Sequence, residues 1–122
     1  MKKLKVLIVD DCAADTKKAA ALLENAGHQV IAASNGQDGI SMARRELPDL
    51  ILMDIVMPGI NGFQATRQLT NDEVTRDIPV IVVSGKNEDS DKVWAMRQGA
   101  RAYLIKHIEK ATLLGAIDEV MP

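Results

Sequence analysis

Three aspartates in this sequence directly follow short apolar runs. Asp10 and Asp11 come after KVLIV, and Asp54 comes after LILM. An unpaired charge at the end of a buried segment costs free energy, so each carboxylate needs a role that offsets this cost. The simplest role is to cap the following helix. The alternative is a reaction centre built from carboxylates.

Carboxylates that converge at one place repel one another, and they persist there only if some stay protonated or a cation lies among them. We favour a cation. The available ligands are carboxylate oxygens, with no nearby histidine and only Cys12 as a nearby thiol. Such hard oxygens suit Mg²⁺, or alternatively Mn²⁺, better than zinc. Mg²⁺ often keeps a position for a phosphate oxygen, so the donor set indicates phosphoryl transfer.

Asp54 stands alone after its run, as a nucleophile that forms an aspartyl phosphate would, while Asp10 and Asp11 form a pair suited to a metal. Ser84 ends PVIVVS and offers a hydroxyl, and Lys106 ends AYLIK and offers an ammonium that balances phosphoryl charge. Taken singly, Ser84 fits a helix cap better and Lys106 fits a solvated side chain better. Together, the four run ends favour a site.

Five short apolar runs precede these polar residues. Their apolar character is nearly continuous rather than alternating, which is typical of parallel strands covered on both faces. The predicted strands are residues 5–9, 29–33, 50–53, 79–83 and 102–105.

Segments with a helical period separate the strands, and each should bury one apolar face. The apolar positions are Ala19, Leu22, Leu23 and Ala26 in the first, Ile40, Ala43 and Leu47 in the second, and Leu113, Ile117 and Val120 in the last. Gly27 follows the first segment where a left-handed residue is wanted, and Pro48 stops the second. A weaker helical segment begins at about Gly62.

In the fourth helical segment, Val93, Met96 and Ala100 predict a stripe that faces the core, with Trp94 and Arg97 on another face. Trp and Arg often anchor interfaces, so these two are candidate contact residues. A partly buried Trp with a structural role fits the sequence equally well.

Strands that alternate with helices predict an α/β fold. Parallel strands need right-handed crossover connections, so we expect a flavodoxin-like (βα)5 doubly wound parallel sheet with strand order 2-1-3-4-5. In this order the first and third strands are neighbours, and ligands bind beyond the carboxyl ends of the strands. The fold therefore brings Asp10, Asp11, Asp54, Ser84 and Lys106 to one edge of the sheet.

Length and composition suit one cytoplasmic domain. With 122 residues we expect a single domain, residues 1–122, and no output domain. A net charge of −2 predicts no nucleic-acid partner. The single cysteine cannot form an internal disulfide, and the apolar stretch near the N-terminus is too short for membrane insertion. Three further residues have plain structural interpretations. Cys12 is expected to be an inert residue at a helix start and His28 a surface residue, while Met57 fits either the core or a contact loop.

The acidic pair, the loop DIVMPG after Asp54, Ser84 and Lys106 form the pattern of response-regulator receiver domains. The sequence resembles this family over essentially its whole length. The stretches DIVMPGINGFQATRQLT (54–70) and DKVWAMRQGARAYLIK (91–106) are most similar to CheY-like single-domain regulators of the PilH type, which act in twitching motility.

The resemblance implies that Asp54 accepts a phosphoryl group from a phosphohistidine on a histidine kinase. It also implies that Asp11 binds Mg²⁺ directly, Asp10 largely through water, and the Val56 carbonyl as a further ligand. Such a protein is a signalling domain rather than an enzyme.

The resemblance further implies that Ser84 moves toward the phosphoryl group and that Tyr103, the switch aromatic, then turns inward. This is a population shift between two packings, after which the surface of the fourth helix, fifth strand and fifth helix binds an unidentified downstream protein. A phosphate sink for another regulator is the alternative output. The other interpretation of Tyr103 is an amphipathic aromatic on an edge strand.

His107 departs from the family pattern, which has Pro after the lysine and a cis peptide between them. A non-proline cis bond costs about 2.5–4 kcal/mol, so we expect a trans Lys106–His107 peptide and a rebuilt loop. His107 fits a solvent-facing loop residue better than a titrating group near the phosphoryl group.

Other classes fit less well. A phosphatase of the haloacid-dehalogenase type needs a second Asp where Val56 stands, and a nucleotide binder needs glycines that DDCAADTKK lacks. The serious alternative is a pseudo-receiver that binds partners without phosphorylation, and only His107 favours it.

Overall fold

The predicted strands form one parallel sheet in the computed structural model, which describes residues 2–122. The strand order is β2-β1-β3-β4-β5, as predicted. Strands β3 and β4 end one residue later than the sequence suggested, so Asp54 and Ser84 belong to the strands themselves. The strands are β1 (Lys5–Val9), β2 (Gln29–Ala33), β3 (Leu50–Asp54), β4 (Val80–Ser84) and β5 (Ala102–Ile105).

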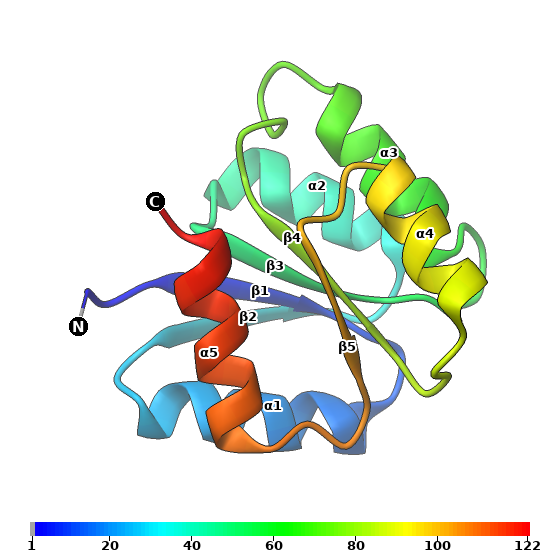
Figure 1. The fold of residues 1–122 in the computed structure, drawn as a ribbon. Coiled ribbons are helices and arrows are strands. Elements are labelled where there is room, and N and C mark those ends of the chain that lie inside the picture. Colours follow the sequence, from blue (N-terminus) through cyan, green and yellow to red (C-terminus); the bar gives the residue numbers. More distant parts are fainter. Residues whose placement is uncertain (1) are drawn as a thin grey trace.

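Helices cover both faces of this sheet (Figure 1). Helices α1 and α5 lie on one face, and α2, α3 and α4 lie on the other. Their bounds are α1 (Ala13–Asn25), α2 (Gly36–Glu46), α3 (Gly62–Asn71), α4 (Asp89–Arg97) and α5 (Lys110–Val120). Within residues 2–122, no helix combines the length and the apolar character that a membrane crossing requires.

Side chains of the central strands alternate between two core layers. Val6 and Ile8 of β1 pack toward α1 and α5, whereas Leu7 and Val9 pack toward α2, α3 and α4. Because both faces are covered, β3 and β4 are buried along their whole length and β1 is buried from Val6 onward, while the edge strands β2 and β5 are less buried. The same period of two directs Asp10 and Asp54 to the face of α1 and α5.

Helix α3 begins at Gly62, where the helical sequence pattern is weak, because a reciprocal cap fixes its start. The Asn61 side chain accepts a hydrogen bond from the Gln64 N–H at 2.9 Å, and the Gln64 side chain accepts one from the Asn61 N–H at 2.9 Å. This capping box satisfies two free amides of the first turn. At the end of α1, Gly27 adopts the predicted left-handed conformation with φ 93°.

The predicted core-facing stripe of α4 is wrong. Val93 and Met96 are 52% and 48% exposed, and the buried residue of the helix is Ala95. Ala100 is buried as predicted, but it follows the helix. With the small Ala95 turned toward the sheet, the neighbouring positions 93 and 96 point away from the core. Helix α4 therefore presents apolar side chains to solvent.

His28 is buried, which corrects the prediction that it lies on the surface. It is 5% exposed, and its Nδ1 accepts a hydrogen bond from the Leu4 N–H at 3.1 Å. The residue thus supplies an acceptor for an amide just before β1. Met57 is buried in the core, which decides between its two interpretations, and Cys12 is the exposed N-cap residue of α1.

The loop after β3 turns back sharply onto the end of that strand. Gly59 has φ 80°, a conformation that glycine adopts without strain, and the Gly62 N–H donates to the Ile55 carbonyl at 2.8 Å. A Cβ atom on Gly62 would lie 2.1 Å from the backbone oxygen of Asp54. Gly62 therefore allows α3 to pack directly against the backbone of Asp54.

We expect Gly62→Ala to lower the free energy of unfolding by about 1–3 kcal/mol, because the added methyl group overlaps backbone that cannot rotate away. Gly115→Ala in α5 is the matched control, since no atom lies within 4 Å of a Cβ there. That change should stabilise the protein by about 0.5–1 kcal/mol through helix propensity. Urea denaturation measures both values. Equal effects of the two substitutions would contradict the close approach at Gly62.

Candidate functional site

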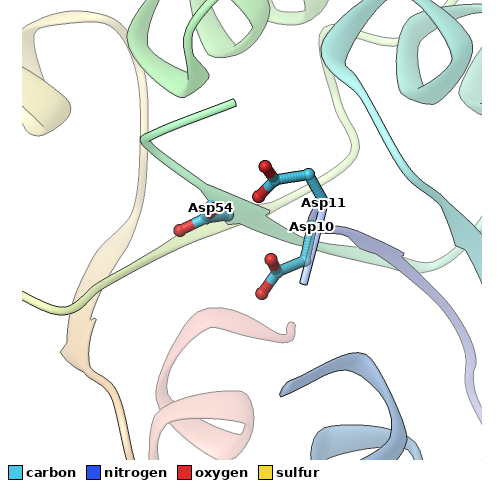
Figure 2. A group of neighbouring side chains, drawn as sticks. All are labelled: Asp10, Asp11 and Asp54. Atoms are coloured by element: carbon cyan, nitrogen blue, oxygen red, sulfur yellow. The ribbon is translucent and has the colours of Figure 1, made fainter. Parts of the chain in front are cut away.

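Three carboxylates meet beyond the carboxyl ends of β1 and β3. Figure 2 shows Asp10, Asp11 and Asp54 near one another at this edge, and each offers an oxygen within 4.8 Å of the others. The parallel pairing of Val9 with Met53 places the ends of the two strands side by side. Asp10 and Asp54 are 9% and 7% exposed, and Asp11 is exposed. The predicted convergence is therefore present.

Lys106, immediately after β5, directs its ammonium into this cluster. Its Nζ lies 3.0 Å from Asp10 Oδ2 and 3.2 Å from Asp54 Oδ1. The third partner is Asp15 Oδ2 in the first turn of α1, at 2.9 Å. Only 18% of the Lys106 side chain is exposed. The alternative of a merely solvated lysine is therefore wrong.

The Lys106–His107 peptide is trans, as predicted. The ammonium nevertheless reaches the carboxylates, so the direction of this side chain does not depend on a proline at position 107. His107 is exposed, as expected for a loop residue.

Burial raises the pKa of Asp54 to about 6, and the negative charge of Asp10 acts in the same direction. The ammonium of Lys106 opposes this shift only in part. Burial also disfavours the charged form of Lys106, but its carboxylate partners outweigh this effect, beginning with Asp15, and hold its pKa above the usual range. The cluster thus carries more negative charge than its one ammonium balances, which is the condition under which a cation binds. The oxygen donors fit Mg²⁺.

The two alternatives based on helix capping are excluded for Asp54 and Ser84. Helix α3 is capped by Asn61, and α4 has Glu88 as its N-cap residue. Asp10 does serve its local backbone, because its Oδ1 accepts a hydrogen bond from the Cys12 N–H at 2.9 Å. Its other oxygen is the one that faces Lys106.

Ser84 and Tyr103 both bind the backbone of Lys86. The Ser84 hydroxyl accepts from the Lys86 N–H at 3.0 Å, and the Tyr103 hydroxyl donates to the Lys86 carbonyl at 2.8 Å. Ser84 is 4% exposed, and Tyr103 is half-buried against the core layer of α2, α3 and α4. The sequence pointed to both side chains but not to the residue that joins them.

Asp15 is the site residue that the sequence analysis missed. The available signal was its place five residues after Asp10, since a helix that begins at the ligand edge of the sheet keeps its first turn near that edge. The ammonium of Lys106 lowers the pKa of Asp15.

Asp54→Asn should stabilise the protein at about pH 7 without divalent cations, by about 1–3 kcal/mol. The folded protein holds the Asp54 proton more tightly than the unfolded chain does, so ionisation reduces stability as the pH rises from 3.8 through about 6. The gain should therefore be nearly absent at about pH 4. Urea denaturation in a chelator at both pH values measures it.

The control for this substitution is Asp77→Asn, which removes the same charge from an exposed loop position. It should change stability by less than about 0.5 kcal/mol at either pH. A loss of stability in Asp54→Asn near pH 7 would contradict the conclusion that ionised Asp54 destabilises the folded protein.

Comparison with known proteins agrees with this geometry. The family model of the response regulator receiver domain matches residues 6–118. Protein PilH of Pseudomonas aeruginosa is 56% identical over 117 residues, which are 96% of this chain and 97% of that protein. The phosphate regulon transcriptional regulatory protein PhoB of the same species is 35% identical over 116 residues, which are 95% of this chain and 51% of PhoB.

Solved structures agree as well. The chemotaxis protein CheY4 of Vibrio cholerae matches with a TM-score of 0.91 at 25% identity, over 98% of this chain and all of that one. A CheY-like receiver domain protein of Methanospirillum hungatei matches with a TM-score of 0.88 at 27% identity, over 97% and 93% of the two chains. The sequence match over residues 6–118 and the shared fold together show that the chain belongs to the response regulator receiver domain family, the signalling domains of two-component systems.

Proposed function

We propose that this protein is a stand-alone, cytoplasmic response regulator that accepts a phosphoryl group on Asp54 from a histidine kinase, with Mg²⁺ bound beside it. The observation that carries the proposal is the convergence of Asp54, the acidic pair and Lys106 at one edge of the sheet. The similarity to PilH over nearly the full length of both chains supports a single-domain regulator of motility.

The residues suited to hold the metal are Asp11, Asp54 and the Val56 carbonyl, with Asp10 acting through water. Burial and the negative charge of Asp10 both raise the pKa of Asp54, and a cation beside these carboxylates would offset their charge, which supports this assignment. When bound, Mg²⁺ supplies positive charge to the phosphoryl oxygens. The position of Val56 in the loop that turns back at Gly59 is consistent with a carbonyl that faces the cluster.

In the transfer step, a carboxylate oxygen of Asp54 attacks phosphorus. The bond between phosphorus and the kinase imidazole nitrogen breaks as the bond to oxygen forms, and the imidazole keeps the electron pair and takes up a proton. Lys106 stabilises the phosphoryl charge because its ammonium is already held next to Asp54. The chain itself therefore provides the nucleophile and a stabilising cation.

The signal then passes through Lys86. When the Ser84 side chain turns toward the phosphoryl group, its oxygen moves away from the Lys86 N–H, and the loss of this hydrogen bond frees the loop whose Lys86 carbonyl binds Tyr103. Tyr103 already packs partly against the core, so the shift alters how this ring is held rather than creating its contact. This coupling favours one of two loop packings.

Output by protein contact through the face of α4, β5 and α5 is supported by the exposed side chains of α4. Val93, Trp94 and Met96 are 48–52% exposed, and Arg97 is exposed beside them. Trp, Met and Arg are enriched at interfaces, and a stripe of apolar side chains in solvent is costly without a partner. We propose this face as the one that binds the downstream protein.

Intact-protein mass spectrometry after incubation with acetyl phosphate tests the phosphoacceptor role. We expect a gain of one phosphoryl mass that requires both Mg²⁺ and Asp54, and therefore no gain in Asp54→Asn. Ser84→Ala should still gain the mass, because its hydroxyl is not the nucleophile. A folded wild-type sample that gains nothing while a known receiver domain does would favour a pseudo-receiver that acts without phosphorylation.

Mg²⁺ alone should raise the melting temperature of the wild-type protein. A ligand that binds only the folded state at 100 times its dissociation constant adds about 2.7 kcal/mol of stability. Asp11→Asn should lose most of this gain, while Asp89→Asn, an exposed carboxylate in α4, should keep it. Equal gains in all three proteins would mean that Mg²⁺ binds elsewhere.

A further inference from the structure

Asp15 is the nearest of the three carboxylates around Lys106. The ammonium donates a hydrogen bond to Asp15 Oδ2 at 2.9 Å, and it lies 3.0 Å from Asp10 and 3.2 Å from Asp54. An ammonium has three N–H donors. Asp15 takes one of these donors in a hydrogen bond, and ion pairs with Asp10 and Asp54 engage the same ammonium, so a further anion has to compete with these partners for Lys106.

Asp15 differs from the other two partners in its place. Asp10 belongs to the group of carboxylates that could hold a metal ion, and Asp54 is the candidate phosphoacceptor. Asp15 lies in the first turn of α1 and is not part of the metal-binding group found among residues 2–122. Its side chain is 24% exposed. The contact of Asp15 with the site therefore runs through Lys106.

A cavity beside Lys106 leaves room for the ammonium to move. It has a volume of about 130 Å³, and Asp10, Asp15, Asp54 and Lys106 all line it. The remainder of its wall is largely apolar, with Ile8 among the lining residues. A shift of the ammonium from one carboxylate to another therefore does not have to displace tightly packed side chains.

We propose that Asp15 is a positioning residue that holds the Lys106 ammonium toward α1, and that Lys106 exchanges Asp15 for the phosphoryl group when Asp54 is phosphorylated. This inference rests on the proposed function. A phosphoryl group concentrates negative charge at Asp54, so the ammonium is drawn toward β3 and away from α1. The start of α1 then loses its contact with Lys106, the residue that follows β5, in the phosphorylated form.

The proposal predicts opposite effects of Asp15→Asn on two ligands. Mg²⁺ alone should bind about three- to tenfold more weakly, because one negative charge near the cluster is lost. Beryllofluoride, a mimic of the phosphoryl group, should bind about three- to tenfold more tightly at saturating Mg²⁺, because Lys106 no longer has to leave Asp15. Damage to the fold would weaken the binding of both ligands.

Titrations followed by calorimetry for Mg²⁺ and by fluorine NMR for beryllofluoride measure the two effects. Glu24→Gln removes the same charge from an exposed position of the same helix and should leave both affinities unchanged. In a Lys106→Met background, Asp15→Asn should no longer strengthen beryllofluoride binding, since the ammonium over which the groups compete is gone.

The outcomes separate this inference from the proposed function. If the wild-type protein binds no beryllofluoride with Mg²⁺ present, the phosphoacceptor role itself is overturned. If the wild-type protein binds it and Asp15→Asn binds it equally or more weakly, the phosphoacceptor role stands and the exchange at Asp15 is overturned.

Discussion

Repulsion among buried carboxylates is the constraint on which the rest of this structure depends. Asp10 directly follows β1 and Asp54 ends the neighbouring β3, both are almost fully buried, and this burial together with the charge of Asp10 raises the pKa of Asp54 to about 6. Lys106 offsets part of this charge, and its ammonium forms ion pairs with three carboxylates. The folded protein therefore holds a site that is short of positive charge. Binding of a cation reduces the repulsion among these carboxylates, so folding stability and ligand binding are coupled through the same few side chains.

The scaffold keeps these charges together by backbone geometry. Parallel pairing aligns the ends of β1 and β3, and the period of two along each strand directs Asp10 and Asp54 to the face of α1. On the other side, the missing side chain of Gly62 lets α3 press against the backbone of Asp54. The site is thus fixed by strand register and by one close contact, while Lys86, in the loop after β4, is held by hydrogen bonds to the Ser84 and Tyr103 side chains that can be exchanged.

Features that depend on local pattern could be predicted from the sequence. The continuous apolar runs, the glycine after α1 and the polar residues at the strand ends predicted the sheet and its strand order. They also predicted the four side chains that the structure brings together, which are Asp10, Asp11, Asp54 and Lys106. Features that depend on packing between distant segments could not. Helix α4 is rotated so that Ala95 packs toward the sheet, and this rotation exposes Val93 and Met96. His28 is buried where it accepts a hydrogen bond from the Leu4 N–H, 24 positions away in the sequence. Asp15 was missed for the same reason, because its partner Lys106 lies 91 positions along the chain.

The most direct test of the central claim is a crystal structure of the protein with Mg²⁺ and beryllofluoride. We expect the beryllium to bind a carboxylate oxygen of Asp54, with Mg²⁺ held by Asp11, Asp54 and the Val56 carbonyl. The Lys106 ammonium should contact a fluoride. A metal ion bound away from these carboxylates, or beryllofluoride attached at another residue, would contradict the account in which the charged end of β3 is the reaction centre.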